Sequence, residues 1–131
     1  MMVADTDVLI DYLRGRNPSA ERVAAELKHG LLRTTVITRF ELFAGARTAR
    51  QESSVRDLLD GIPTLSLDQE AADLAAQVRR NLEGAGQSIG MADSLIAGTV
   101  LAHGAVLLTR NRRHFERVSG LRLADLPAEN T

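Results

Sequence analysis

Four side chains with oxygen donors stand where a metal site could form in the sequence: Asp5, Glu41, Asp93 and Asn111. Carboxylate and amide oxygens are the ligands that Mg²⁺ and Mn²⁺ prefer in proteins. Converging acids repel one another, so such a site is strained until a cation neutralises it. A cation held in this way lowers the pKa of a water and neutralises charge that builds on a phosphoryl group. The four residues therefore indicate phosphodiester chemistry.

Asp5 and Asp93 carry most of this hypothesis. Asp5 follows a short apolar segment and precedes an apolar helical pattern, so its carboxylate stands where open α/β sheets bind ligands, at the carboxyl end of a strand. A helix N-cap is the alternative, although Thr6 or Asp7 could serve that role equally well. Asp93 shares a predicted helical face with apolar residues. A buried, unpaired carboxylate is costly, so we favour a cation there over a helix-dipole contact alone.

Glu41 and Asn111 have ordinary structural explanations when each is taken alone. Glu41 borders the apolar stripe of a predicted helix, where its carboxylate could simply reach water. Asn111 follows a predicted strand that ends at Thr109, and Asn is a common turn residue. Together with the two acids on other elements, both are expected to contribute to one oxygen-rich site.

Basic side chains crowd the segment around Asn111, namely Arg110, Arg112, Arg113 and Arg117. The net charge of the chain is -1, so no global field attracts a polyanion. We interpret the four arginines as local phosphate contacts in preference to a solvated turn. His114 in the same segment could be a general base or an RNA contact, although a lone His is more often structural.

The composition is that of one globular domain, with 44% hydrophobic and 25% charged residues in a chain of 131. The absence of Cys excludes disulfides, thiolate metal sites and cysteine nucleophiles, and it fits a reducing compartment. No apolar run approaches the ~20 residues of a membrane span, and acids near the N-terminus argue against a signal peptide. We therefore expect a cytoplasmic protein with no membrane partner.

Strands alternate with helices along the chain, which predicts an α/β fold with a parallel sheet covered on both faces. The pattern predicts strands ending near residues 5, 35, 67, 109 and 123. It predicts helices over residues 18–29, 36–50, 52–60 and 90–103, one that Gly15 ends, and one that Asp68 caps. Residues 110–117 are expected to form a basic turn. The apolar stripe of the helix over residues 36–50 is expected to face the core: Val36, Ile37, Phe40, Phe43 and Ala44.

The segments 3–7, 39–42, 90–97 and 108–115 resemble, in order, the motifs of the PIN-domain ribonucleases, and among them the VapC-type toxins of bacterial toxin–antitoxin pairs. The resemblance implies a single PIN domain over residues 1–131, with three α/β/α layers around a central parallel sheet. It also implies a Mg²⁺- or Mn²⁺-dependent endoribonuclease that forms a homodimer and is neutralised by a VapB-like antitoxin.

The resemblance implies a role for each residue of the site. Asp5 and Asp93 would hold the metal directly, Glu41 would complete its shell or orient a water, and Asn111 matches the fourth catalytic position. The side chains expected to support them are Thr6, Thr109 and, as a secondary candidate, Asp7. The implied reaction is in-line attack of water on an RNA phosphodiester.

Two other interpretations stay open. Because Asn111 adds no charge, the fold could bind RNA or an antitoxin without cutting. The run Asp5-Thr6-Asp7 also matches the Asp-x-Asp that opens haloacid-dehalogenase-type phosphotransferases. That family needs a downstream lysine, and the only lysine, Lys28, comes too early in the chain.

Overall fold

A computed structural model describes residues 1–126 and contains one five-stranded sheet. The strands are β1 (Met2–Ala4), β2 (Leu32–Thr35), β3 (Thr64–Leu65), β4 (Val106–Leu108) and β5 (Arg122–Leu123). Their order is β3-β2-β1-β4-β5, and every neighbouring pair is parallel. The chain moves outward from β1 through β2 to β3 and then returns to the other side of β1. This order creates a topological switch point between β1 and β4, where open parallel sheets bind ligands.

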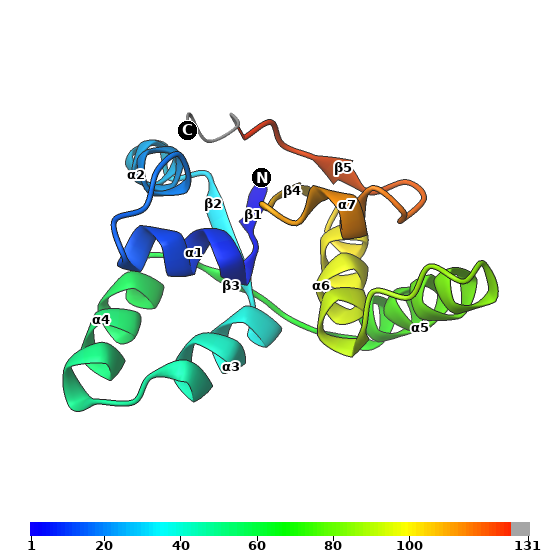
Figure 1. The fold of residues 1–131 in the computed structure, drawn as a ribbon, viewed down its shortest axis with the longest axis horizontal. Coiled ribbons are helices and arrows are strands. Elements are labelled where there is room, and N and C mark those ends of the chain that lie inside the picture. The colour runs from blue at the N-terminus through cyan, green and yellow to red at the C-terminus, as the bar shows by residue number, and fades with distance from the viewer. Residues whose placement is uncertain (127–131) are drawn as a thin grey trace.

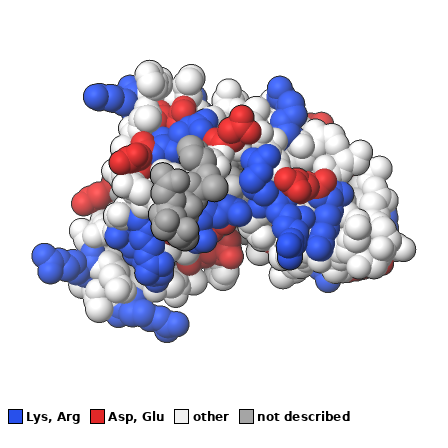
Figure 2. All heavy atoms as spheres, turned by 45° about the horizontal axis from the view of Figure 1, so that its top comes forward, with Lys and Arg blue, Asp and Glu red and all other residues white. Residues whose placement is uncertain are grey.

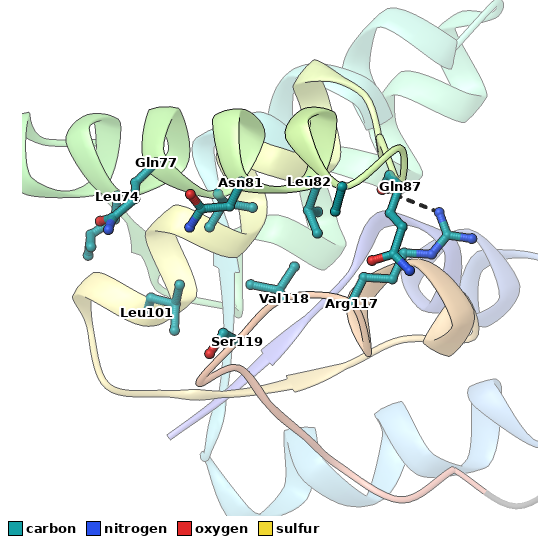
Figure 3. Close-up of a pocket in the computed structure, with 11 residues that line it drawn as sticks. Leu74, Gln77, Asn81, Leu82, Gln87, Leu101, Arg117, Val118 and Ser119 are labelled. Atoms are coloured by element: carbon teal, nitrogen blue, oxygen red, sulfur yellow. Dashed lines mark hydrogen bonds between the residues drawn. The ribbon is translucent and has the colours of Figure 1, made fainter.

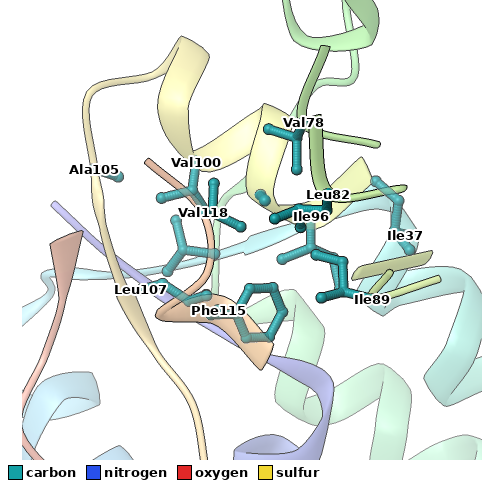
Figure 4. Close-up of a cluster of buried hydrophobic side chains, with 12 residues drawn as sticks. Ile37, Val78, Leu82, Ile89, Ile96, Val100, Ala105, Leu107, Phe115 and Val118 are labelled. Carbon is teal, nitrogen blue, oxygen red and sulfur yellow. The ribbon is translucent and has the colours of Figure 1, made fainter. Parts of the chain in front are cut away.

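Helices cover both faces of this sheet, as Figure 1 shows. They are α1 (Thr6–Leu13), α2 (Ser19–His29), α3 (Val36–Gly45), α4 (Ala49–Asp60), α5 (Gln69–Gly84), α6 (Met91–Ala102) and α7 (Arg112–Phe115). The helices α1, α2 and α4 bury one apolar cluster against the sheet. The helices α5, α6 and α7 bury a second cluster, drawn in Figure 4. The expected three-layer α/β/α architecture is therefore confirmed. Within residues 1–126, no helix is long and apolar enough to cross a membrane.

Polar caps explain where several helices begin. The Thr35 hydroxyl accepts a hydrogen bond from Thr38 N at 3.0 Å, and Asp68 Oδ1 accepts one from Ala71 N at 2.9 Å. These contacts satisfy backbone donors that the first helical turn leaves free. The predicted cap at Asp68 is confirmed. Because Thr35 is the last residue of β2, the chain enters α3 without a loop.

Four expectations about helices are corrected. The helix predicted over residues 36–50 ends at Gly45, and the helix predicted over residues 52–60 begins earlier, at Ala49, where the hydroxyl of Thr48 caps it. The segment after Asn111 contains the short helix α7 and is not only a turn. Pro18 is the N-cap of α2 and not its first helical residue, so that helix begins one residue later than predicted.

The predicted apolar stripe of α3 is wrong in part. Phe40 is 72% exposed and Val36 is 39% exposed, whereas Ile37 and Leu42 are buried. The helix crosses the carboxyl end of the sheet, so Ile37 joins one apolar cluster and Leu42 joins the other. The burial stripe therefore runs along a different side of the helix from the one that Phe40 occupies.

Gly98 permits close packing of α5 on α6. A Cβ atom at position 98 would lie 2.6 Å from Ala71 O and 2.6 Å from Ala75 Cβ, which is closer than real carbon atoms approach. The backbone of α6 therefore touches α5 directly at this point. Asp93 lies in the first turn of the same helix.

Candidate functional site

Asp5 lies at the switch point between β1 and β4. Its backbone N donates to Leu108 O at 2.8 Å, and its Oδ1 accepts from Thr6 N at 2.8 Å, so it is the N-cap of α1. Its Oδ2 accepts a hydrogen bond from Thr109 Oγ1 at 2.7 Å. The residue is only 5% exposed. The Asp5 carboxylate therefore caps α1 and also lies at the carboxyl end of β1.

Burial and neighbouring acids disfavour the charged form of Asp5. Burial, followed by the charge of Asp7, raises the pKa of Asp5 to about 7, and Asp93 adds a smaller effect in the same direction. The hydrogen bonds from Thr109 and Thr6 oppose this shift. No cationic side chain within residues 1–126 contacts the Asp5 carboxylate. Such a group favours a bound cation, because a cation stabilises the charged form.

Asp7 of α1 and Asp93 of α6 show the same trend. Burial raises the pKa of Asp7, and contacts with Arg110 oppose the shift. Burial also raises the pKa of Asp93, opposed by His114 and reinforced by the charge of Glu41. The charge of Glu41 raises the pKa of Asp93, and the charge of Asp93 raises the pKa of Asp5. The three predicted metal ligands therefore influence one another electrostatically.

Glu41 reaches the site through hydroxyl groups. Thr6 Oγ1 donates to Glu41 Oε1 at 2.7 Å and lies 3.0 Å from Thr38 Oγ1. Thr38 is buried and also lies 3.2 Å from Thr35 Oγ1. This chain of hydroxyls links the start of α1 to α3. Sequence reasoning included Thr6 but missed Thr35 and Thr38, whose Thr-x-x-Thr spacing across the start of a helix was the available signal.

His114 connects Asn111 to Asp93. Its Nδ1 lies 2.9 Å from Asn111 Nδ2 and 3.5 Å from Asp93 Oδ2. The backbone N of Asn111 donates to Thr109 Oγ1 at 2.9 Å. The structure therefore brings Asn111 to the edge of the acidic site. The sequence analysis gave His114 as a general base, an RNA contact or a structural residue, and its contacts with Asn111 and Asp93 are of the structural kind.

The four arginines differ in what they contact. Arg110 Nε lies 2.6 Å from Asp11 Oδ2, and Arg112 Nη1 donates to Ala124 O at 2.7 Å. Arg117 Nη1 donates weakly to Gln87 O at 3.4 Å. Arg113 is exposed, and no hydrogen bond or ion pair joins its side chain to the described part of the chain. Figure 2 shows basic side chains gathered on the face that includes α7 and β5, with acidic side chains among them.

Residues 1–126 contain no group of three or more Asp, Glu or His side chains already arranged to hold a metal ion. Each acid is hydrogen bonded or close to a separate partner: Asp5 to Thr109, Glu41 to Thr6, and Asp93 to His114. Mg²⁺ keeps several waters and is usually held by one or two carboxylates. The donors available here are carboxylate oxygens, which is the ligand type that Mg²⁺ and Mn²⁺ bind.

A cavity of about 550 Å³ lies between α5 and the segment that follows α7, as Figure 3 shows. Leu74, Val78, Leu82, Leu101 and Val118 provide its apolar lining. Gln87 and Arg117 lie at one end. None of the predicted acids lines this cavity, so it is separate from the acidic site.

The fold is that of one known family. The PIN-domain family model matches residues 2–121, and the chain belongs to the PIN-domain family. It is similar to the tRNA(fMet)-specific endonuclease VapC of Shigella flexneri, with 31% identity over 92% of this chain and 94% of that protein. It is also similar to Ribonuclease VapC19 of Mycobacterium tuberculosis, with 28% identity over 88% of this chain and 92% of that protein. These relatives place it among the VapC-type ribonucleases.

Solved structures agree with this placement. A chain in the crystal structure of DNA-bound VapBC from Salmonella typhimurium superposes with a TM-score of 0.83 at 28% identity, and the match covers 95% of this chain and 96% of that one. A chain in the structure of VapBC-1 from nontypeable Haemophilus influenzae gives 0.79 at 29% identity, with coverages of 95% and 96%. The family resemblance predicted from four sequence segments is confirmed.

Proposed function

We propose that this protein is a metal-dependent endoribonuclease and the toxin of a toxin–antitoxin pair. The observation that carries the proposal is the buried Asp5 carboxylate at the β1–β4 switch point, which faces other acids and contacts no cationic side chain in residues 1–126. A divalent cation would stabilise that charge, and an RNA phosphodiester is the substrate whose negative charge such a cation neutralises. The names of the VapC relatives support ribonuclease activity.

In this proposal Asp5 and Asp93 hold Mg²⁺ or Mn²⁺, with Glu41 contributing directly or through water. When bound, the cation would lower the pKa of an attacking water and neutralise charge on the scissile phosphate. The hydroxyl of Thr109 orients the Asp5 carboxylate, and the hydroxyl of Thr6 orients that of Glu41. Such supporting contacts commonly change metal affinity or activity by about 10–100-fold.

The remaining side chains would act on the RNA or on the acids. Arg113 is the best placed of the predicted phosphate contacts, because its guanidinium is exposed and uncommitted within the described residues. His114 holds the edge of the site by linking Asn111 to Asp93. The charge of Asp7 raises the pKa of Asp5 and so disfavours a second negative charge beside it, and Asp7 is itself held by a hydrogen bond from Arg110 N at 3.4 Å.

The similarity to VapC proteins also suggests the binding partners of this chain. The similar solved structures are VapBC complexes, so we assign this chain a VapB-like antitoxin that covers the acidic site. We also assign it a homodimer in the cytoplasm. Exposed apolar side chains on α3 and at the start of α6 support self-association, since Phe40 is 72% and Met91 is 64% exposed.

Inducible expression with sequencing of new RNA 5′ ends tests the proposal. The wild-type chain should arrest growth and create new 5′ ends at defined sites, and co-expression of its antitoxin should remove both effects. Asp5→Asn should give neither. New 5′ ends that persist with Asp5→Asn would overturn the proposal. RNA binding without any cleavage, at all metal concentrations, would instead support the binding-module alternative.

A further inference from the structure

The ion pair between Arg110 and Asp11 joins the loop after β4 to helix α1. Arg110 Nε lies 2.6 Å from Asp11 Oδ2, so the pair joins segments that are far apart in the chain. The Asp11 side chain is 7% exposed, whereas that of Arg110 is 50% exposed. A carboxylate this buried needs a partner, so the cation of Arg110 is committed to the protein.

The residues that flank this ion pair hold the acids of the site. Thr109 Oγ1 donates to Asp5 Oδ2 at 2.7 Å, and Arg110 N lies 3.4 Å from Asp7 Oδ1. Asn111 N donates back to Thr109 Oγ1 at 2.9 Å. Three consecutive residues of one loop are therefore tied, directly or through each other, to the start of α1.

The ion pair attaches the loop after β4 to α1 at a second point. Asp7 and Asp11 are separated by four residues, so they lie on the same face of α1. The loop therefore contacts α1 at its first turn through Asp5 and Asp7, and one turn later through Asp11. Two points of attachment fix both the position and the direction of the loop, whereas one would allow it to pivot.

We propose that Arg110 and Asp11 form a clamp that positions the Thr109 hydroxyl on Asp5, and that Arg110 is a positioning residue and not a phosphate contact. The catalytic consequence of the clamp depends on the ribonuclease activity proposed above, but the clamp itself does not. Arg113 shows the contrast, because it is exposed and has no such partner among residues 1–126.

Amide hydrogen exchange in the metal-free protein tests the clamp without any enzyme activity. The amides of residues 110 and 111 should exchange at least about tenfold faster in Asp11→Asn and in Arg110→Ala than in wild type, because they lose the local restraint. Arg110→Lys keeps a cation and should recover part of the protection, which keeps the test valid if Asp11→Asn does not fold. Glu83→Gln is the matched control, since it breaks the exposed Arg79–Glu83 pair. Unchanged exchange in the Arg110 and Asp11 variants would overturn the proposal.

Steady-state RNA cleavage separates positioning from RNA contact. A clamp predicts that Asp11→Asn and Arg110→Ala each lower kcat by about 10–100-fold at nearly constant KM. It also predicts that the double variant is no worse than either single variant, because both remove one interaction. An RNA contact predicts that Arg110→Ala raises KM, and that Asp11→Asn, which removes a negative charge, lowers it; that result would overturn the clamp. If wild type cuts no RNA under any condition, the proposed function fails, and amide exchange still decides the clamp.

Discussion

Thr109 Oγ1 donates a hydrogen bond of 2.7 Å to Asp5 Oδ2, and this contact joins the ends of the two central strands. Both residues are buried, so the bond is shielded from competing water. It lowers the pKa of Asp5 against the larger effect of burial. The hydroxyl therefore stabilises the charged carboxylate that the proposed metal requires.

Replacement of the hydroxyl should weaken metal binding. Thr109→Val removes the donor while keeping the volume, so the pKa of Asp5 should rise further and Mn²⁺ affinity at pH 7.5 should fall by about 10–100-fold. Thr109→Ser keeps the hydroxyl and should bind Mn²⁺ nearly as well as wild type. Calorimetric titration measures both. Equal affinity of the Val and Ser variants would show that the hydroxyl has no such role.

The raised pKa of Asp5 predicts how the stability of the metal-free protein depends on pH. Its carboxyl ionises near 3.8 when unfolded and at about 7 when folded, so the folded state binds the proton more tightly. Stability should therefore fall as pH rises from about 4 to 7, by on the order of a few kcal/mol, since one pKa unit corresponds to about 1.4 kcal/mol. Asp5→Asn has no such charge and should be more stable than wild type at pH 8.

Urea unfolding at pH 5 and pH 8, with metal removed, checks this prediction. The advantage of Asp5→Asn over wild type should be larger at pH 8 than at pH 5. Asp57→Asn is a suitable control, because Asp57 is an exposed acid on α4. An advantage of Asp5→Asn that does not grow with pH would mean that burial does not penalise the charge of Asp5.

The contact at Gly98 predicts a packing cost. Gly98→Ala would place a Cβ 2.6 Å from atoms of Ala71 and Ala75, so it should destabilise the fold by roughly 1–3 kcal/mol as α6 moves away from α5. Gly84→Ala is the control, because a Cβ there meets no atom within 4 Å, and it should change stability by less than ~1 kcal/mol. Thermal unfolding compares the two. A neutral Gly98→Ala would show that the helices can separate without loss.

The exposed ring of Phe40 predicts a surface for self-association. Phe40→Glu should shift the protein toward monomer in light scattering and leave its melting temperature near that of wild type at matched monomer content. Leu31→Glu alters another exposed apolar residue, 52% exposed and placed before β2 at the opposite end of the strand, and it should leave the dimer intact. A dimer that survives Phe40→Glu would place the interface elsewhere.

The sequence predicted the architecture because the relevant signals are local. Helix caps such as Asp68, helix stops such as Gly15 and the alternation of apolar segments each depend on residues within one or two turns. The candidate acids were chosen for a similar reason, since Asp5 follows a predicted strand and Asp93 lies on a predicted apolar helix. In both cases a charged side chain occupies a position where the sequence pattern predicts burial, and a buried charge needs a partner.

Contacts between distant segments were not predictable in the same way. The pairing of Arg110 with Asp11 depends on β4 lying next to β1, and the sequence alone does not define strand order. The exposure of Phe40 depends on how α3 crosses the end of the sheet. A helical wheel identifies an apolar stripe. It does not show that one helix contributes side chains to two separate apolar clusters.

Addition of Mn²⁺ to the metal-stripped protein, with RNA cleavage followed in the same samples, tests the central claim most directly. We predict no cleavage before the metal is added, cleavage that rises with Mn²⁺ for wild type, and none at any concentration for Asp5→Asn or Asp93→Asn. Cleavage by the stripped wild-type protein in the presence of a chelator, or full cleavage by either variant, would contradict the claim that these acids hold a cation required for the reaction.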